Sequence, residues 1–177
     1  MLDPKVFKAY DVRGIYPAEL DEEGAYAIGR AYVEQFEPRK IAVGRDMRIS
    51  APAMARAAMD GAADAGADVL DLEMVGTEMV YFAVGELGLD GGIAVTASHN
   101  PKEYTGMKIV RRGALPVGGD SGLLEIRDRA HETLQQSVAK TVELGRGCRA
   151  APSRRRRGAR PRARSSSRCT PSGCATP

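Results

Sequence analysis

The stretch that decides the fold is GGIAVTASHNPKEYTGMK, residues 91–108. Its apolar run from Ile93 to Val95 predicts a short buried strand. Asn100-Pro101 marks a turn soon after it, because proline restricts the residue before it to extended geometry. Ser98 is therefore expected on a tight loop at the carboxyl end of a strand, which is the edge where open α/β sheets bind their ligands.

The residues around Ser98 favour phosphoryl transfer over hydrolysis. His99, Lys102 and Lys108 follow the serine closely, and a hydroxyl among cations suits an oxygen nucleophile that carries or receives a phosphoryl group. A serine hydrolase is disfavoured because adjacent Ser98 and His99 side chains are expected to diverge, and no Gly-x-Ser-x-Gly elbow surrounds the serine. Taken alone, the loop is also consistent with a structural serine that bonds its own backbone.

Predicted strands and helices alternate along the rest of the chain. Strands are expected at residues 6–15, 41–44, 68–72, 93–95 and 107–110, and helices at residues 21–37, 50–65, 77–87 and 121–140. This order predicts an α/β fold, a three-layer domain with a mixed, mostly parallel β-sheet between helices. Met79 and Phe82, on the third helix, are expected to be core residues.

Two arginines follow the second predicted strand, in the pattern Gly-Arg-Asp-x-Arg-x-Ser. Arg45 and Arg48 could bind an anion, but an Arg–Asp pair that braces the loop explains the pattern equally well. Bracing pairs are commoner than ligands, so the structural interpretation is favoured.

Charge is distributed unevenly. All 23 acidic residues precede Gly145, whereas 10 of the 26 Lys and Arg follow it, so the two parts carry formal charges of −7 and +10. The three cysteines also lie in the basic part. Residues 1–144 are therefore expected to form one domain without a disulfide framework, and residues 145–177 a disordered Arg-rich tail.

Nucleic-acid binding by this tail is not expected, because it has neither lysine nor interleaved aromatic residues for base stacking. Its composition is also what GC-rich codons yield when they are read out of frame. The favoured hypothesis is therefore that the tail is a frameshift product. The start of the chain lacks the apolar core of a signal peptide, and no apolar run approaches the length of a membrane span. A cytoplasmic protein without membrane contact is the expectation.

Two motifs carry a family resemblance. Residues 96–101, TASHNP, with Tyr104, Gly106 and Lys108 at fixed spacing, resemble the phosphoserine loop of the α-D-phosphohexomutases, the phosphomannomutase/phosphoglucomutase family. Residues 7–14, FKAYDVRG, resemble the amino-terminal signature of the same family. The family commonly has Asn at the position of Thr105. The likeness covers about residues 5–142, which correspond to the family's domain I alone.

The resemblance implies a set of residue roles. Ser98 would be the phosphoserine that exchanges its phosphoryl group with a hexose phosphate through a hexose 1,6-bisphosphate. Arg13 and Lys108 would bind phosphate oxygens, and His99 would hydrogen-bond the sugar or assist proton movement. Tyr10 and Asn100 would bind the substrate, and a Mg²⁺ ion would be held partly through the phosphate on Ser98.

The family's metal loop of alternating aspartates, its Gly-Glu-x-Ser-Gly-His sugar loop and its Ser-Gly-Thr phosphate loop have no counterpart in this sequence. The chain is therefore expected to be truncated and inactive alone, and its preferred hexose cannot be predicted. The alternative is a non-catalytic phosphosugar- or anion-binding module with a basic tail.

Overall fold

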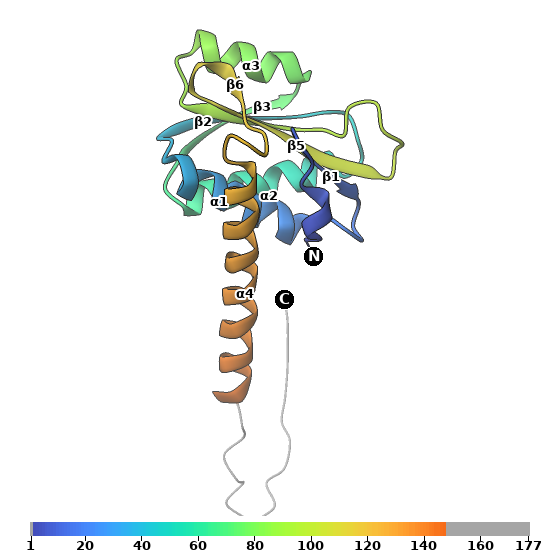
Figure 1. Ribbon diagram of the computed structural model, residues 1–177, viewed down its shortest axis with the longest axis vertical. Helices are drawn as coiled ribbons and strands as arrows, with labels where there is room; N and C mark the ends of the chain where they lie inside the picture. Colours follow the sequence, from blue (N-terminus) through green and yellow to red (C-terminus); the bar gives the residue numbers. More distant parts are fainter. Residues whose placement is uncertain (1, 148–177) are drawn as a thin grey trace, which may run out of the picture.

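A computed structural model describes residues 2–147 of the chain (Figure 1). Its helices and strands follow the predicted alternation. In order they are η1 (Pro4–Val6), β1 (Val12–Ile15), α1 (Glu22–Phe36), β2 (Lys40–Arg45), α2 (Ala51–Asp64), β3 (Asp68–Met74), α3 (Thr77–Glu86), β4 (Gly91–Val95), β5 (Tyr104–Arg111), η2 (Arg112–Ala114), β6 (Leu115–Pro116) and α4 (Leu123–Gly147).

The sheet has six strands in the order β1-β5-β4-β2-β3, with β6 beside β5. Strand β2 runs parallel to β3 and to β4, whereas β5 is antiparallel to β1, β4 and β6. All the strands except β5 therefore point the same way, with two parallel and three antiparallel pairings, and the predicted mixed sheet is confirmed. Strand β4, which leads into the serine loop, lies between β5 and β2.

Helices cover both faces of the sheet, which confirms the three-layer arrangement. Helices α1 and α2 pack against each other on one face and α3 covers the other (Figure 1). The larger core lies between the sheet and α1, α2 and α4, and it includes Ile28, Met54, Ile93, Ile109 and Ile126. A smaller cluster under α3 contains Ala42, Val84, Leu89 and Val110.

Helix α3 differs from its prediction. Met79 and Phe82 were expected in the core, but they are 47% and 61% exposed, so this expectation was wrong. The helix is apolar on more than one face, and its buried residues are Val80, Ala83 and Val84, with Tyr81 partly buried beside them. The i, i+3, i+4 spacing of these three residues matches a single helix face.

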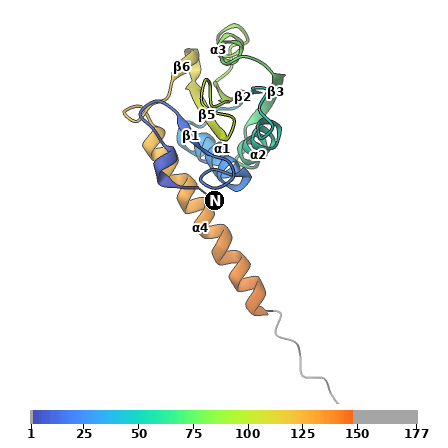
Figure 2. The ribbon, with the colours of Figure 1, turned by 90° about the vertical axis from the view of Figure 1, so that its right-hand side faces the viewer.

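Two boundaries also differ from the sequence-based expectation. The strand predicted for residues 6–15 is confined to Val12–Ile15. Pro4–Val6 form a 3₁₀ turn in which the Asp3 carboxylate accepts from the Lys5 amide, and the chain then turns again, with the Lys8 amide donating to the Asp11 carbonyl. Helix α4 continues past the predicted end at residue 140 to Gly147, and it projects away from the sheet (Figure 2). The remainder of the predicted tail, 148–177, lies outside the described residues.

Within residues 2–147, no helix combines the length and the apolar character that crossing a bilayer requires.

Candidate active site

The serine loop leaves the core at the carboxyl end of β4. Thr96 and Ala97 are buried and the next residue, Ser98, is exposed. Two hydrogen bonds fix this exit: the Thr96 amide donates to the Gly106 carbonyl over 2.9 Å, and the Ser98 amide donates to Thr96 Oγ1 over 2.8 Å. Ser98 itself has a left-handed backbone, with φ 54°. A non-glycine residue in this conformation needs support from its surroundings.

The hydroxyl of Ser98 contacts the neighbouring imidazole. Ser98 Oγ and His99 Nδ1 lie 3.3 Å apart, within hydrogen-bond distance, so the expectation that the two side chains diverge was wrong. Adjacent side chains point to opposite sides in extended backbone, whereas Ser98 has a left-handed backbone. Among the described residues no carboxylate is hydrogen-bonded to His99, so the three-membered relay of a serine hydrolase is not formed there.

Arg13 and Lys108 lie on adjacent strands and share one carboxylate. Arg13, on β1, pairs in register with Gly106 on β5. Its guanidinium contacts Asp11 Oδ2 over 2.5 Å, and Lys108 Nζ lies 3.7 Å from the same oxygen. The Nε of Arg13 is buried without a hydrogen-bond partner. One carboxylate therefore faces two cations, and the cluster retains a net positive charge that suits phosphate oxygens.

Gly106 explains how β1 and the residue after β4 can both approach β5 at this point. A Cβ atom on Gly106 would lie 2.2 Å from the Val12 carbonyl oxygen on β1 and 3.1 Å from the Thr96 carbonyl oxygen. Both atoms belong to backbone and cannot rotate away. A glycine is required here to keep β1, with Arg13, against β5.

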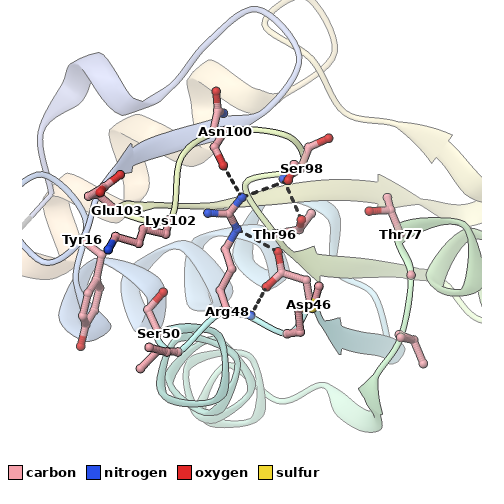
Figure 3. A pocket seen from close by; sticks show the side chains of 14 residues that line it. Tyr16, Asp46, Arg48, Ser50, Thr77, Thr96, Ser98, Asn100, Lys102 and Glu103 are labelled. Carbon is pink, nitrogen blue, oxygen red and sulfur yellow. Dashed lines mark hydrogen bonds and ion pairs between the residues drawn. The ribbon is translucent and has the colours of Figure 1, made fainter.

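Arg48 connects a different loop to the serine loop (Figure 3). Its Nε contacts Asp46 Oδ2 over 3.2 Å, which is the bracing pair predicted from the sequence. Its terminal nitrogens also donate to four carbonyl oxygens of the serine loop and the start of β5, those of Ser98, Asn100, Pro101 and Tyr104. Arg45 instead pairs with Asp71, at 3.5 Å.

A cavity of about 800 Å³ adjoins the serine loop. Ser98, Asn100 and Lys102 line it together with Arg48 and Tyr16. The Tyr16 hydroxyl donates a hydrogen bond to Glu22, and this bond raises the pKa of Tyr16 above its ordinary value. The lining is mixed: hydroxyl, amide and ammonium groups lie beside two carboxylates, those of Asp46 and Glu103, and apolar side chains such as Met47 and Ile49. Ligand pockets in proteins commonly combine a few polar groups with an apolar lining.

The profile of the phosphoglucomutase/phosphomannomutase alpha/beta/alpha domain I matches residues 4–137 of the chain. The chain belongs to this family. It is similar to a phosphomannomutase of Salmonella montevideo, with 54% identity over 121 residues that cover 68% of this chain and 26% of that protein. A phosphomannomutase sequence of Klebsiella pneumoniae is also 54% identical over 126 residues, which cover 71% of this chain and 80% of that sequence.

A solved structure agrees with these matches. A phosphoglucomutase/phosphomannomutase family protein of Burkholderia thailandensis superposes with a TM-score of 0.69 at 37% identity, over 75% of this chain and 31% of that one. The chain thus spans less than a third of the Salmonella and Burkholderia proteins. The family resemblance and the α/β fold inferred from the sequence are confirmed.

The predicted site residues of this phosphohexomutase domain fall into four places, and of these residues only Ser98 and Asn100 are among those that line the cavity. Ser98 and His99 are in contact, and Arg13 and Lys108 form a cationic cluster around Asp11. Asn100 lines the cavity, and its Nδ2 is buried without a hydrogen-bond partner. Tyr10 is 77% exposed and is not among the residues that line the cavity. The roles assigned to these residues from the family resemblance remain predictions.

The described residues do not by themselves provide a Mg²⁺ site. Mg²⁺ takes about six oxygen ligands in near-octahedral geometry. Within residues 2–147 there is no group of three or more His, Cys, Asp or Glu side chains that could hold a metal ion. The Ser98 oxygen is one ligand at most, so Mg²⁺ remains a prediction and no step below is assigned to it.

Proposed function

We propose that Ser98 receives a phosphoryl group from a hexose 1,6-bisphosphate and returns it to a hexose phosphate. In a complete phosphohexomutase this exchange interconverts hexose 1-phosphate and hexose 6-phosphate. The observation that carries the proposal is the exposed Ser98 hydroxyl, 3.3 Å from an imidazole nitrogen, at the end of β4 beside the strands that hold two cations. The printed names of the relatives, phosphomannomutases, support the same chemistry.

The proposed transfer uses groups of this chain. Ser98 Oγ attacks phosphorus, a new O–P bond forms, and the P–O bond to the sugar breaks. His99 Nδ1 accepts the Ser98 hydroxyl proton, and the departing sugar oxygen keeps the bonding pair and takes up a proton to become a hydroxyl. The reverse sequence returns the phosphoryl group. Phosphoryl transfer depends mainly on positioning and on neutralising oxygen charge, and Arg13 and Lys108 are the groups assigned to that task.

The substrate assignments follow from the remaining residues. We assign Asn100 to sugar binding because it lines the cavity beside Ser98. Tyr10 is assigned to the sugar on the family resemblance. We further propose that sustained mutase turnover requires residues beyond those described. The groups assigned here act on the phosphoryl group that is transferred to or from Ser98, and none is assigned to the second phosphoryl group of the bisphosphate.

The test is phosphorylation of the full 177-residue chain. The purified chain is incubated with glucose or mannose 1,6-bisphosphate, with and without Mg²⁺, and intact mass and peptide mapping locate any phosphate. We expect one phosphate on Ser98. Ser98→Ala removes the acceptor, whereas Ser50→Ala, a serine that lines the same cavity, is the matched control and retains the phosphate.

Two results would contradict the proposal. Absence of phosphate in the wild-type chain would leave the anion-binding alternative, in which the bisphosphate binds without transfer. Phosphate that persists in Ser98→Ala would place the acceptor elsewhere. Robust interconversion of mannose or glucose phosphates by this chain alone would refute the proposed need for further residues.

A further inference from the structure

Arg48 has all of its hydrogen-bonding capacity engaged by the backbone of the serine loop and by one carboxylate. A guanidinium carries five N–H donors and no acceptor. One terminal nitrogen donates to the carbonyl oxygens of Pro101 and Tyr104, over 2.6 and 3.2 Å. The other donates to those of Ser98 and Asn100, over 3.0 and 2.7 Å, and Nε donates to Asp46 at 3.2 Å. These five bonds leave no donor for a phosphate.

The serine loop needs a group of this kind. Four carbonyl oxygens of the loop converge on one region, where their partial negative charges repel one another unless a cation lies between them. A planar guanidinium can donate in several directions at once, whereas the lysine ammonium is a compact charge with three donors. Arg48 comes from the loop after β2, so it ties two loops about 50 residues apart in the sequence.

These bonds bear directly on Ser98. The Ser98 amide is held by Thr96 Oγ1, and the Ser98 carbonyl is held by Arg48. Both peptide groups that flank the Ser98 Cα atom are therefore fixed, which maintains the left-handed backbone and with it the direction of the side chain toward His99 Nδ1. Small misplacements of a reacting group lower transfer rates strongly.

We propose that Arg48 is a positioning residue for phosphoryl transfer at Ser98: it binds the loop rather than the substrate and sets the orientation of the serine hydroxyl. This inference rests on the proposed function for its effect on rate, but the loop geometry can be measured separately. Arg13, by contrast, donates to a single carboxylate, that of Asp11, and it is the arginine assigned to phosphate.

The experiment compares the full wild-type chain with Arg48→Ala, Arg48→Lys and the control Arg56→Ala, which removes an exposed arginine paired with Asp60 on α2. Amide hydrogen exchange of residues 97–104 reports the loop, and exchange in β2 and β4 reports the fold. The rate of Ser98 phosphorylation is then measured against hexose 1,6-bisphosphate concentration.

In Arg48→Ala we expect amide exchange in residues 97–104 to accelerate on the order of 100-fold while the sheet stays protected, because several charge-assisted bonds are lost locally. The maximal phosphorylation rate falls by a similar factor, but the half-saturating bisphosphate concentration stays the same, since Arg48 has no donor for the substrate. Arg48→Lys is expected to recover part of both losses, and Arg56→Ala behaves as wild type.

Three outcomes would overturn the inference. Unchanged loop exchange in Arg48→Ala means that the guanidinium does not hold the loop. A raised half-saturating concentration with an unchanged maximal rate means that Arg48 binds phosphate. If Arg48→Ala does not fold, full activity and normal loop exchange in Arg48→Lys would also refute the positioning role. If the wild-type chain takes up no phosphate, the proposed function fails, and the exchange measurement alone decides the loop role.

Discussion

Replacement of Gly106 by alanine tests the close approach of β1, which carries Arg13, to β5. The added Cβ would lie 2.2 Å from the Val12 carbonyl oxygen and 3.1 Å from that of Thr96, and both neighbours are backbone. Strand β1 must move outward to accept it. Overpacking of this type costs about 1–3 kcal/mol, and we expect about 2–3 kcal/mol because no side chain can yield.

For a domain of this size, each kcal/mol lowers Tm by about 4 °C, so Gly106→Ala should melt about 8–12 °C below wild type. Thermal unfolding followed by circular dichroism measures the shift. The matched control is Gly85→Ala on α3, where a Cβ meets nothing within 4 Å. There alanine should add about 0.5–1 kcal/mol through helix propensity. A Gly106→Ala variant as stable as Gly85→Ala would refute the close approach of β1 and β5.

Three further predictions concern stability. Tyr32→Phe removes the buried hydroxyl that donates to the Val110 carbonyl over 2.9 Å, and urea unfolding should show a loss of about 1–2 kcal/mol; no loss would mean that this bond is absent in solution. The hydrogen bond from Arg112, with those from two backbone amides, lowers the pKa of Asp90 in the folded protein. The Asp90 carboxylate therefore stabilises the fold above its unfolded pKa of about 4, and this contribution is lost as the pH falls through the lowered folded pKa. Asp90→Asn should therefore flatten the acid limb of a stability–pH curve, and an unchanged limb contradicts the shift. Phe82→Ser, at a 61% exposed position, should change the unfolding free energy by no more than about 0.5 kcal/mol, whereas a large loss would restore the core assignment.

The layered fold and the position of Ser98 could be predicted because they depend on local signals. The apolar run before Thr96 and the turn at Asn100-Pro101 both act over a few residues, and the structure places the serine loop at the end of β4 accordingly. The exposure of Met79 and Phe82 could not be predicted in this way. Whether an apolar side of a helix is buried depends on what packs against it. Among the described residues, none covers Met79 and Phe82.

Two features of the site depend on contacts that could not be predicted from this sequence alone. The Ser98–His99 contact follows from a left-handed serine, which has no reliable local signature for a residue other than glycine. The carbonyl contacts of Arg48 join segments far apart in the chain, and the sequence indicated only its pair with Asp46. The Gly-Arg-Asp-x-Arg-x-Ser pattern was the nearest signal, and it marked the loop without identifying its partner.

Reversible phosphate exchange at Ser98 tests the central claim most directly. The full chain is labelled with hexose 1,6-bisphosphate carrying radioactive phosphate, freed of excess reagent, and then mixed with unlabelled hexose phosphate. We predict that label enters at Ser98 and leaves as newly formed hexose 1,6-bisphosphate, with Ser98→Ala unlabelled throughout. Label that never reaches Ser98, or that leaves only as inorganic phosphate, would contradict the account.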